Sequence, residues 1–385
     1  MQPPFASFGG KRRVAHLVWP RFGPARNYVE PFAGSLAMLL ARPPLPGATE
    51  DTPRGLWGTE TANDADALIA NFWRAARWAP DEVAEHADWP VNEADLHARQ
   101  WAIIDRLPEH QLRMHREYRY YDAEIAGLWV WGVCQWIGGA WCQVKGGHAS
   151  KSSKPYLRSE GMGIGCLTPV SVGTQPDLKA NRGIMSLTPT RTGSPPQLLH
   201  NGGILSKSAG PGGQIPDLGG GRGIHSHLMR SSNLYDYMGL LCRRLRRVRI
   251  CCGDWTRVMG PSVTVLHGGR TAVFLDPPYD DSAGRDPNLY AVESRVSGDV
   301  RAWAIANGDD PRLRIALCGY EGEHDMPATW EKVAWKATGG YGNQRKDGTN
   351  EHCKLERIWF SPHCLRPGDG HEQLSFLSSD GHPAV

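Results

Sequence analysis

Asp276-Pro277-Pro278-Tyr279 combines residue types that can hold an amino group at the end of a strand. The preceding run, 271–275, is apolar, β-branched and aromatic, so it predicts a buried strand. Both prolines fix φ and lack an N–H donor, so the turn offers mainly acceptors, the Asp276 carboxylate and the Pro277 carbonyl. The Tyr279 ring could cover the flat face of a base. A proline-rich turn with no binding role is the alternative.

A second candidate for ligand binding spans residues 28–37, Tyr-Val-Glu-Pro-Phe-Ala-Gly-Ser-Leu-Ala. A short apolar strand, an acidic residue and a glycine turn precede a helical pattern over 35–41. Backbone N–H groups converge at a helix N-terminus, so this loop could cradle a ligand with its backbone.

A third candidate lies about thirty residues further on, a distance that agrees with a βαβ unit. Residues 60–66 read as a strand that ends in acidic residues, and 67–73 read as a helix. A carboxylate at this position commonly holds ribose hydroxyls in nucleotide-binding α/β folds. The alternative is a helix N-cap, formed by Asp64 or Asp66.

These motifs together resemble the Dam-like, phage-type family of DNA adenine-N6 methyltransferases. The segment 276–279 is similar to the signature of amino-methyltransferases that act on adenine N6. The segment 28–37 resembles the family's S-adenosylmethionine loop, usually Pro-Phe-x-Gly-x-Gly, with Leu36 in place of the second glycine. The resemblance implies an α/β, Rossmann-like S-adenosylmethionine-dependent methyltransferase sheet. Two later strands are expected within 312–320 and 356–363.

The resemblance also implies S-adenosyl-L-methionine as the cofactor. The segment 5–12 resembles the family's opening Gly-Gly-Lys segment, which is expected to touch the methionine end of the cofactor, although a flexible basic arm would look similar. Asp254 and Trp255 are expected beside the cofactor's adenine, or else form a turn Asp and a packing Trp. Asp64 takes the ribose role, with Glu60 as the second candidate. The expected cofactor-binding residues are Phe8, Lys11, Glu30, Pro31, Phe32, Ala33, Gly34, Asp64, Asp254 and Trp255.

The implied reaction is methylation of adenine N6 in double-stranded DNA, with the adenine flipped out of the stack. The expected catalytic residues are Asp276, Pro277, Pro278 and Tyr279. The Asp276 carboxylate and the Pro277 carbonyl would accept hydrogen bonds from N6, and Tyr279 would stack on the ring. Direct transfer needs neither a covalent intermediate nor a metal. The alternatives are cytosine-N4 methylation and a noncatalytic DNA-binding repeat protein with a decayed methyltransferase shell, which Leu36 would support.

Composition leaves the partner open, because 385 residues carry a net charge of only +3. The densest basic patch, five arginines within 243–249, could bind phosphates or form a solvated helix face.

Nine cysteines without a paired CxxC pattern predict no zinc site. A start without an apolar signal sequence predicts reduced thiols and a cytoplasmic setting. The apolar segment 127–142 is too short to span a membrane and predicts a buried helix.

An internal repeat occupies the centre of the chain. Gly-Ile recurs every twenty residues, at 163, 183, 203 and 223, and a Pro-x-Leu precedes each copy. A DNA-clasping array, a flexible insert and a duplication without a role are all consistent with it; position favours DNA contact and composition favours disorder.

The predicted regions are a cofactor-binding half (1–85), a helical segment with a candidate DNA contact (86–150), the repeat insert as candidate target recognition (151–231), a catalytic half (232–365) and a polar tail (366–385).

Overall fold

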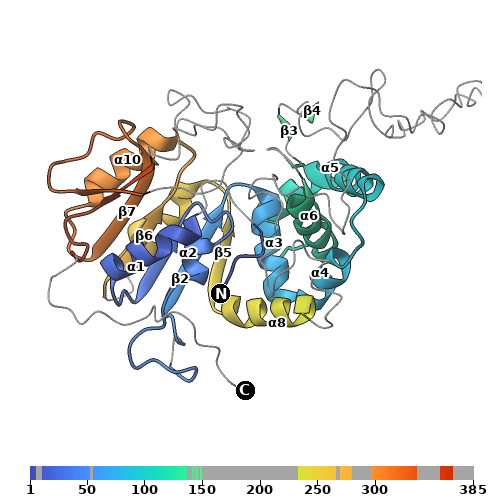
Figure 1. Ribbon diagram of the computed structural model, residues 1–385, viewed down its shortest axis with the longest axis horizontal. Helices are drawn as coiled ribbons and strands as arrows, with labels where there is room; N and C mark the ends of the chain where they lie inside the picture. Colours follow the sequence, from blue (N-terminus) through green and yellow to red (C-terminus); the bar gives the residue numbers. More distant parts are fainter. Residues whose placement is uncertain are drawn as a thin grey trace, which may run out of the picture.

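The computed structural model has an α/β fold in which one large sheet lies beside a group of helices (Figure 1). The repeat insert and nearly all of the polar tail lie outside the residues that the structure describes. Those residues are 1–5, 11–52, 55–136, 141–142, 144–145, 148–149, 233–265, 269–279, 296–335 and 356–366.

The sheet has seven strands in the order β5-β2-β1-β6-β7-β9-β8. The first five in this order are parallel, whereas β9 runs antiparallel to both β7 and β8. The strands predicted within 271–275, 312–320 and 356–363 are confirmed, whereas β8 was not predicted. A separate antiparallel pair joins β3 (Val144–Lys145) to β4 (His148–Ala149). The strands of the sheet are β1 (Asn27–Glu30), β2 (Thr59–Asp64), β5 (Val248–Cys252), β6 (Thr271–Leu275), β7 (Leu313–Tyr320), β8 (Glu331–Ala334) and β9 (Glu356–Phe360).

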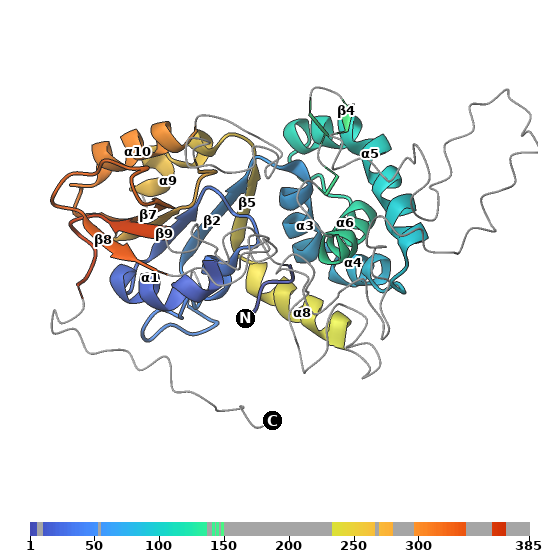
Figure 2. The same cartoon turned by 45° about the horizontal axis from the view of Figure 1, so that its top comes forward.

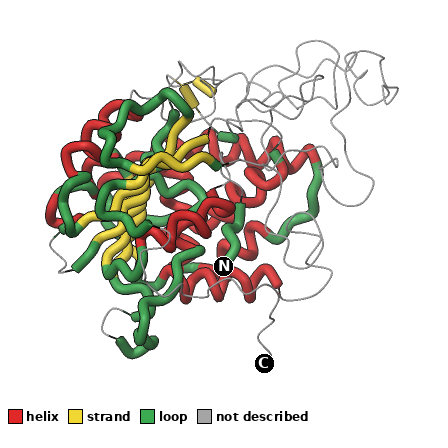
Figure 3. The backbone as a smooth tube through the Cα atoms, turned by 60° about the vertical axis from the view of Figure 1, so that its left-hand side comes forward, coloured by secondary structure: helices red, strands yellow, loops and turns green. Residues whose placement is uncertain are grey.

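Both faces of the sheet are covered, which explains why the central strand β6 is an apolar run with every residue buried. In β6, Ala272 and Phe274 join one hydrophobic cluster, and Val273 and Leu275 join the other, as the two-residue period of a strand requires. Figures 2 and 3 show the twisted sheet with helices on both sides. The first cluster includes residues of α1 (Ala15–Phe22), α2 (Ala37–Leu40) and α3 (Ala67–Trp78). The second includes η4 (Trp255–Val258), α9 (Pro261–Thr264) and α10 (Val296–Asn307).

The neighbouring helices surround α6 (Ala123–Gln135), which confirms a buried helix in the first part of the segment 127–142, although the helix begins earlier and ends at Gln135. It packs against α3, α4 (Pro80–Ala87) and α5 (Glu93–Arg116), and α8 (Asn233–Leu245) packs against α3 and α4. A Cβ at Gly127 would lie 2.4 Å from the His86 Cβ, so α4 and α6 approach closely at a glycine. In the described part of the chain, no helix is long and apolar enough to cross a membrane.

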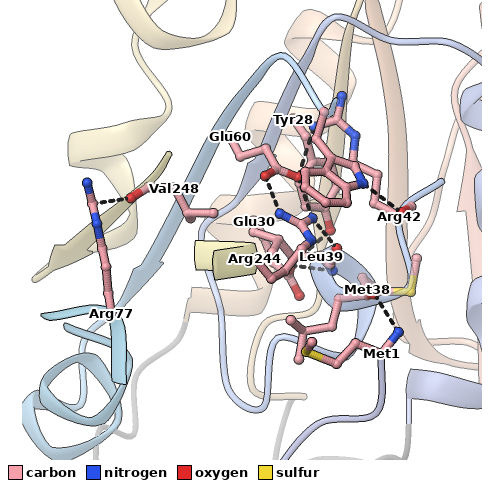
Figure 4. Close-up of polar contacts among 12 residues, drawn as sticks. Met1, Tyr28, Glu30, Met38, Leu39, Arg42, Glu60, Arg77, Arg244 and Val248 are labelled. Atoms are coloured by element: carbon pink, nitrogen blue, oxygen red, sulfur yellow. Dashed lines mark hydrogen bonds and ion pairs between the residues drawn. The ribbon is translucent and has the colours of Figure 1, made fainter. Parts of the chain in front are cut away.

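A buried ion cluster joins α8 to the first half of the sheet (Figure 4). Glu60, near the start of β2, accepts hydrogen bonds from Arg42 at 3.1 Å and from Arg244 at 2.6 and 2.7 Å. Arg244 also donates to the Leu39 carbonyl at 2.7 Å. Glu60 therefore lies at the opposite end of β2 from Asp64 and is paired with two arginines, which argues against a ribose-binding role. Arg244, within the basic run, is a buried structural residue.

Candidate active site

The predicted motifs meet at one edge of the sheet, because parallel strands place their C-terminal ends together. Glu30 ends β1, Asp64 ends β2, Asp254 follows β5 and Asp276 follows β6. The neighbours β1 and β6 form the point at which the strand order reverses: β1 leads into α2 on one face, and the next described helix after β6 is α10 on the other. Such a switch point is where open α/β sheets bind ligands.

Asn63, next to the last residue of β2, ties three of these loops together. Its side-chain amide donates to the carbonyls of Pro31 at 3.1 Å and Gly253 at 2.9 Å. The backbone carbonyl of Asn63 accepts a hydrogen bond from the Ala33 N–H at 2.8 Å. Asn63 was not among the predicted site residues. The sequence feature that could have identified Asn63 is an amide side chain in a predicted strand, directly before the acidic residue Asp64.

Asp64 organises the glycine turn that follows β1. Its Oδ2 accepts from the Gly34 N–H at 2.8 Å, and its Oδ1 accepts from the Asp66 N–H at 2.9 Å. The N-cap of α3 is Asp66, whose carboxylate accepts from the Leu68 N–H at 2.8 Å. The N-cap interpretation is therefore correct for Asp66 and wrong for Asp64. Burial, together with the Asp66 charge, raises the pKa of Asp64 to about 7.

Leu36 adopts the backbone conformation that normally favours glycine. Its φ is +53° and that of Gly34 is +46°. The Leu36 side chain is fully buried in the hydrophobic cluster shared with α1 and α2. The loop thus keeps a glycine-like path while the leucine side chain packs into the core. This turn also delays the start of α2, which was expected over 35–41 and is found at Ala37–Leu40.

Glu30 connects the end of β1 to the same loop. Its Oε2 accepts from the Tyr28 hydroxyl at 2.9 Å and from the Leu39 N–H at 3.2 Å. Burial raises the pKa of Glu30 to about 8. Among the described residues, both hydrogen bonds reach Oε2, so Oε1 keeps its acceptor capacity for a ligand.

Phe32 and Trp255 form the aromatic part of the site. Their ring centroids lie 6.1 Å apart with an interplanar angle of 30°. Trp255 is buried and Phe32 is half-buried. Asp254 is exposed and caps η4, where it accepts from the backbone N–H of Thr256 at 2.9 Å and from the Thr256 hydroxyl. The alternative interpretation, a hydrogen-bonded turn Asp beside a packing Trp, therefore describes Asp254 and Trp255 in this structure.

Asp276 lies in a buried polar cluster with Lys11, which belongs to the 3-10 helix η1 (Lys11–Val14). The Lys11 ammonium is 3.2 Å from Oδ1, and the Asp276 side chain is 19% exposed. The Tyr279 hydroxyl lies 3.4 Å from the same oxygen. Burial raises the pKa of Asp276, and the Lys11 charge opposes that effect. Within the described chain both contacts reach Oδ1, so Oδ2 is left for a ligand.

Tyr279 and Lys11 make contacts that the sequence did not predict. The Tyr279 ring is buried edge-on against Tyr320, with centroids 4.6 Å apart, and its hydroxyl donates to Glu356 Oε2 at 2.9 Å. Lys11 also pairs with Glu356, at 3.4 Å. Lys11 thus pairs here with two protein carboxylates, whereas its contact with a cofactor carboxylate stays a prediction. Phe8 lies outside the described residues.

No protein-family model matches this chain, and no curated protein sequence is significantly similar to it. A functional assignment therefore depends on the motifs and on the arrangement that the fold imposes on them.

Proposed function

We propose that this protein methylates adenine N6 in double-stranded DNA with S-adenosylmethionine as the methyl donor. One observation carries the proposal: the Asp276 carboxylate, with one oxygen left for a ligand, lies across the switch point from the glycine turn after Glu30. When the seven strands of the sheet are numbered along the chain, their order across the sheet is 3-2-1-4-5-7-6, which agrees with a Rossmann-like methyltransferase sheet.

The residues at the edge of the sheet fit the proposed cofactor. S-adenosylmethionine, when bound, supplies a methyl group on a positively charged sulfur. The turn at Gly34 has the positive φ that allows a backbone to approach a ligand closely, and the rings of Phe32 and Trp255 offer an apolar surface for an adenine. Asp64, which already orders this turn, would hold the ribose.

Asp276 would orient the target amine. An exocyclic amine carries two N–H donors, and the Asp276 Oδ2 atom and the Pro277 carbonyl are two acceptors from adjacent residues. Accepting both hydrogens would aim the nitrogen lone pair away from the turn. The amine is inaccessible within a stacked duplex, so base flipping is part of the proposal. Holding the reacting groups in one geometry supplies much of the rate. Stacking of the base on Tyr279 stays a prediction.

The alternative of a decayed, noncatalytic shell depended on Leu36 in place of a glycine. Leu36 keeps a positive φ and buries its side chain in the core. The leucine side chain therefore does not occupy the space that the loop would offer to the cofactor. This geometry removes the reason for expecting a damaged cofactor site.

The test uses purified protein, duplex DNA and S-adenosylmethionine with a labelled methyl group, followed by mass spectrometry of the nucleosides. Labelled N6-methyladenine supports the proposal. Labelled N4-methylcytosine would change the substrate and keep the reaction class. Tight cofactor binding without any labelled DNA would favour the noncatalytic alternative.

A further inference from the structure

Glu356 enters the Asp276 cluster from the antiparallel strand β9, far from every motif in the sequence. Its side chain is buried, and its Oε2 lies 2.9 Å from the Tyr279 hydroxyl and 3.4 Å from the Lys11 ammonium. Asp276 meets the same two groups through Oδ1, at 3.4 and 3.2 Å. Two carboxylates therefore share one ammonium and one phenol.

The hydrogen positions in this cluster follow from the donors available. A phenol has one hydrogen to donate, and Lys11 donates to the Tyr279 oxygen. The phenol hydrogen must then go to a carboxylate, and the distances favour Glu356, at 2.9 Å, over Asp276, at 3.4 Å. Without the Glu356 carboxylate, that hydrogen would turn to Asp276, and Asp276 alone would balance the Lys11 charge.

We infer that Glu356 is a positioning residue that reserves Asp276 for the target amine, because it accepts the Tyr279 hydrogen and shares the Lys11 charge. This inference rests on the proposed methyl transfer to an exocyclic amine. It assigns a function to a contact between β9 and the loop after β6 that otherwise would only stabilise the fold.

The charges around Asp276 predict a pH signature. Burial and the Asp276 charge raise the pKa of Glu356, while Lys11 lowers it. Removal of the Glu356 charge takes a like charge away from Asp276. It also leaves Asp276 as the one charged partner of the Lys11 ammonium within this cluster, and both changes lower the pKa of Asp276. The titratable groups that face Asp276 or act on it are Lys11, Glu30, Tyr279, Cys318, Glu323 and Glu356.

The experiment compares Glu356→Gln with the wild-type chain across pH; the amide can still accept the Tyr279 hydrogen, so this variant tests the charge that Glu356 shares with Lys11. The variant should lower kcat about ten- to a hundredfold, the loss expected when a charge-assisted contact in the site is disturbed. The KM for S-adenosylmethionine should stay within about threefold, and the acid limb of kcat should move to lower pH by about half a unit to one unit. Glu331→Gln is the matched control, because Glu331 pairs with Arg21 beside the opposite end of β9.

Wild-type kcat and an unmoved acid limb in Glu356→Gln would overturn the inference. Tyr279→Phe gives an independent reading if Glu356→Gln fails to fold, because it keeps the ring and removes only the hydroxyl. If that hydrogen belongs to Glu356, the acid limb should not move to higher pH. An upward shift means that Tyr279 donates to Asp276 and also overturns the inference. Absence of any methyl transfer by the wild-type chain contradicts the proposed function instead.

Discussion

The carboxylate of Asp64 accepts a 2.8 Å hydrogen bond from the backbone N–H of Gly34. This bond joins the end of β2 to the turn after β1, so the residue that is proposed to hold the ribose also shapes the loop. Burial raises the pKa of the same carboxyl group to about 7. Because Asp66 and not Asp64 caps the helix α3, the contribution of Asp64 to ligand binding can be measured separately from helix capping.

Asp64→Ala should weaken S-adenosylmethionine binding about ten- to a hundredfold, because the ribose loses an acceptor and the glycine turn loses its anchor. Calorimetric titration measures this directly. Asp66→Ala is the control: loss of the N-cap should cost about 1 kcal/mol of stability and leave cofactor affinity unchanged. Normal affinity in Asp64→Ala would leave Asp64 with a structural role only.

Glu30→Gln should change the pH dependence of stability. The free carboxyl titrates near 4.5 and the folded one near 8, so the unfolded chain loses its proton first and stability falls as pH rises between these values. The amide keeps an acceptor for Tyr28 and Leu39 and carries no charge to bury. Urea denaturation should therefore give the variant higher stability than wild type at pH 8 to 9 and similar stability near pH 4. If the stabilities of the variant and the wild type change with pH in parallel across this range, Glu30 is not protonated in the folded state.

Leu36 offers a test of the positive φ. Truncation to alanine should cost about 3 kcal/mol from lost burial, and the strained backbone would persist. Glycine loses the same side chain but relieves about 1 kcal/mol of strain. Chemical denaturation should thus rank Leu36→Gly above Leu36→Ala in stability, the reverse of the order in an ordinary helix. The usual order would contradict the left-handed conformation.

Arg244→Ala should destabilise the fold by about 3 kcal/mol, because Glu60 stays buried with only one of its two arginines. Arg243→Ala, an exposed neighbour on α8, is the matched control and should change stability by less than about 0.5 kcal/mol. Equal effects in the two variants would show that the cluster does not hold α8 to the sheet.

The motifs that the sequence revealed are local ones. Asp276 follows an apolar strand directly, and Asp64 precedes a helix at a recognisable spacing, so short-range pattern was sufficient to place both at strand ends. Glu356 and Lys11 are 345 residues apart, and nothing local indicates that their side chains pair. Tertiary contacts alone determine that pairing, as they do the role of Asn63 and the burial of Arg244.

The most direct measurement compares Asp276→Ala with wild type in two assays, transfer of labelled methyl from S-adenosylmethionine to duplex DNA and calorimetric binding of the cofactor. Wild type should produce N6-methyladenine. Because Asp276 is proposed to orient the amine rather than to hold the cofactor, the variant should produce none while binding the cofactor with an affinity within about threefold of wild type. Undiminished transfer by Asp276→Ala, or loss of cofactor binding in a variant that remains folded, would contradict this account.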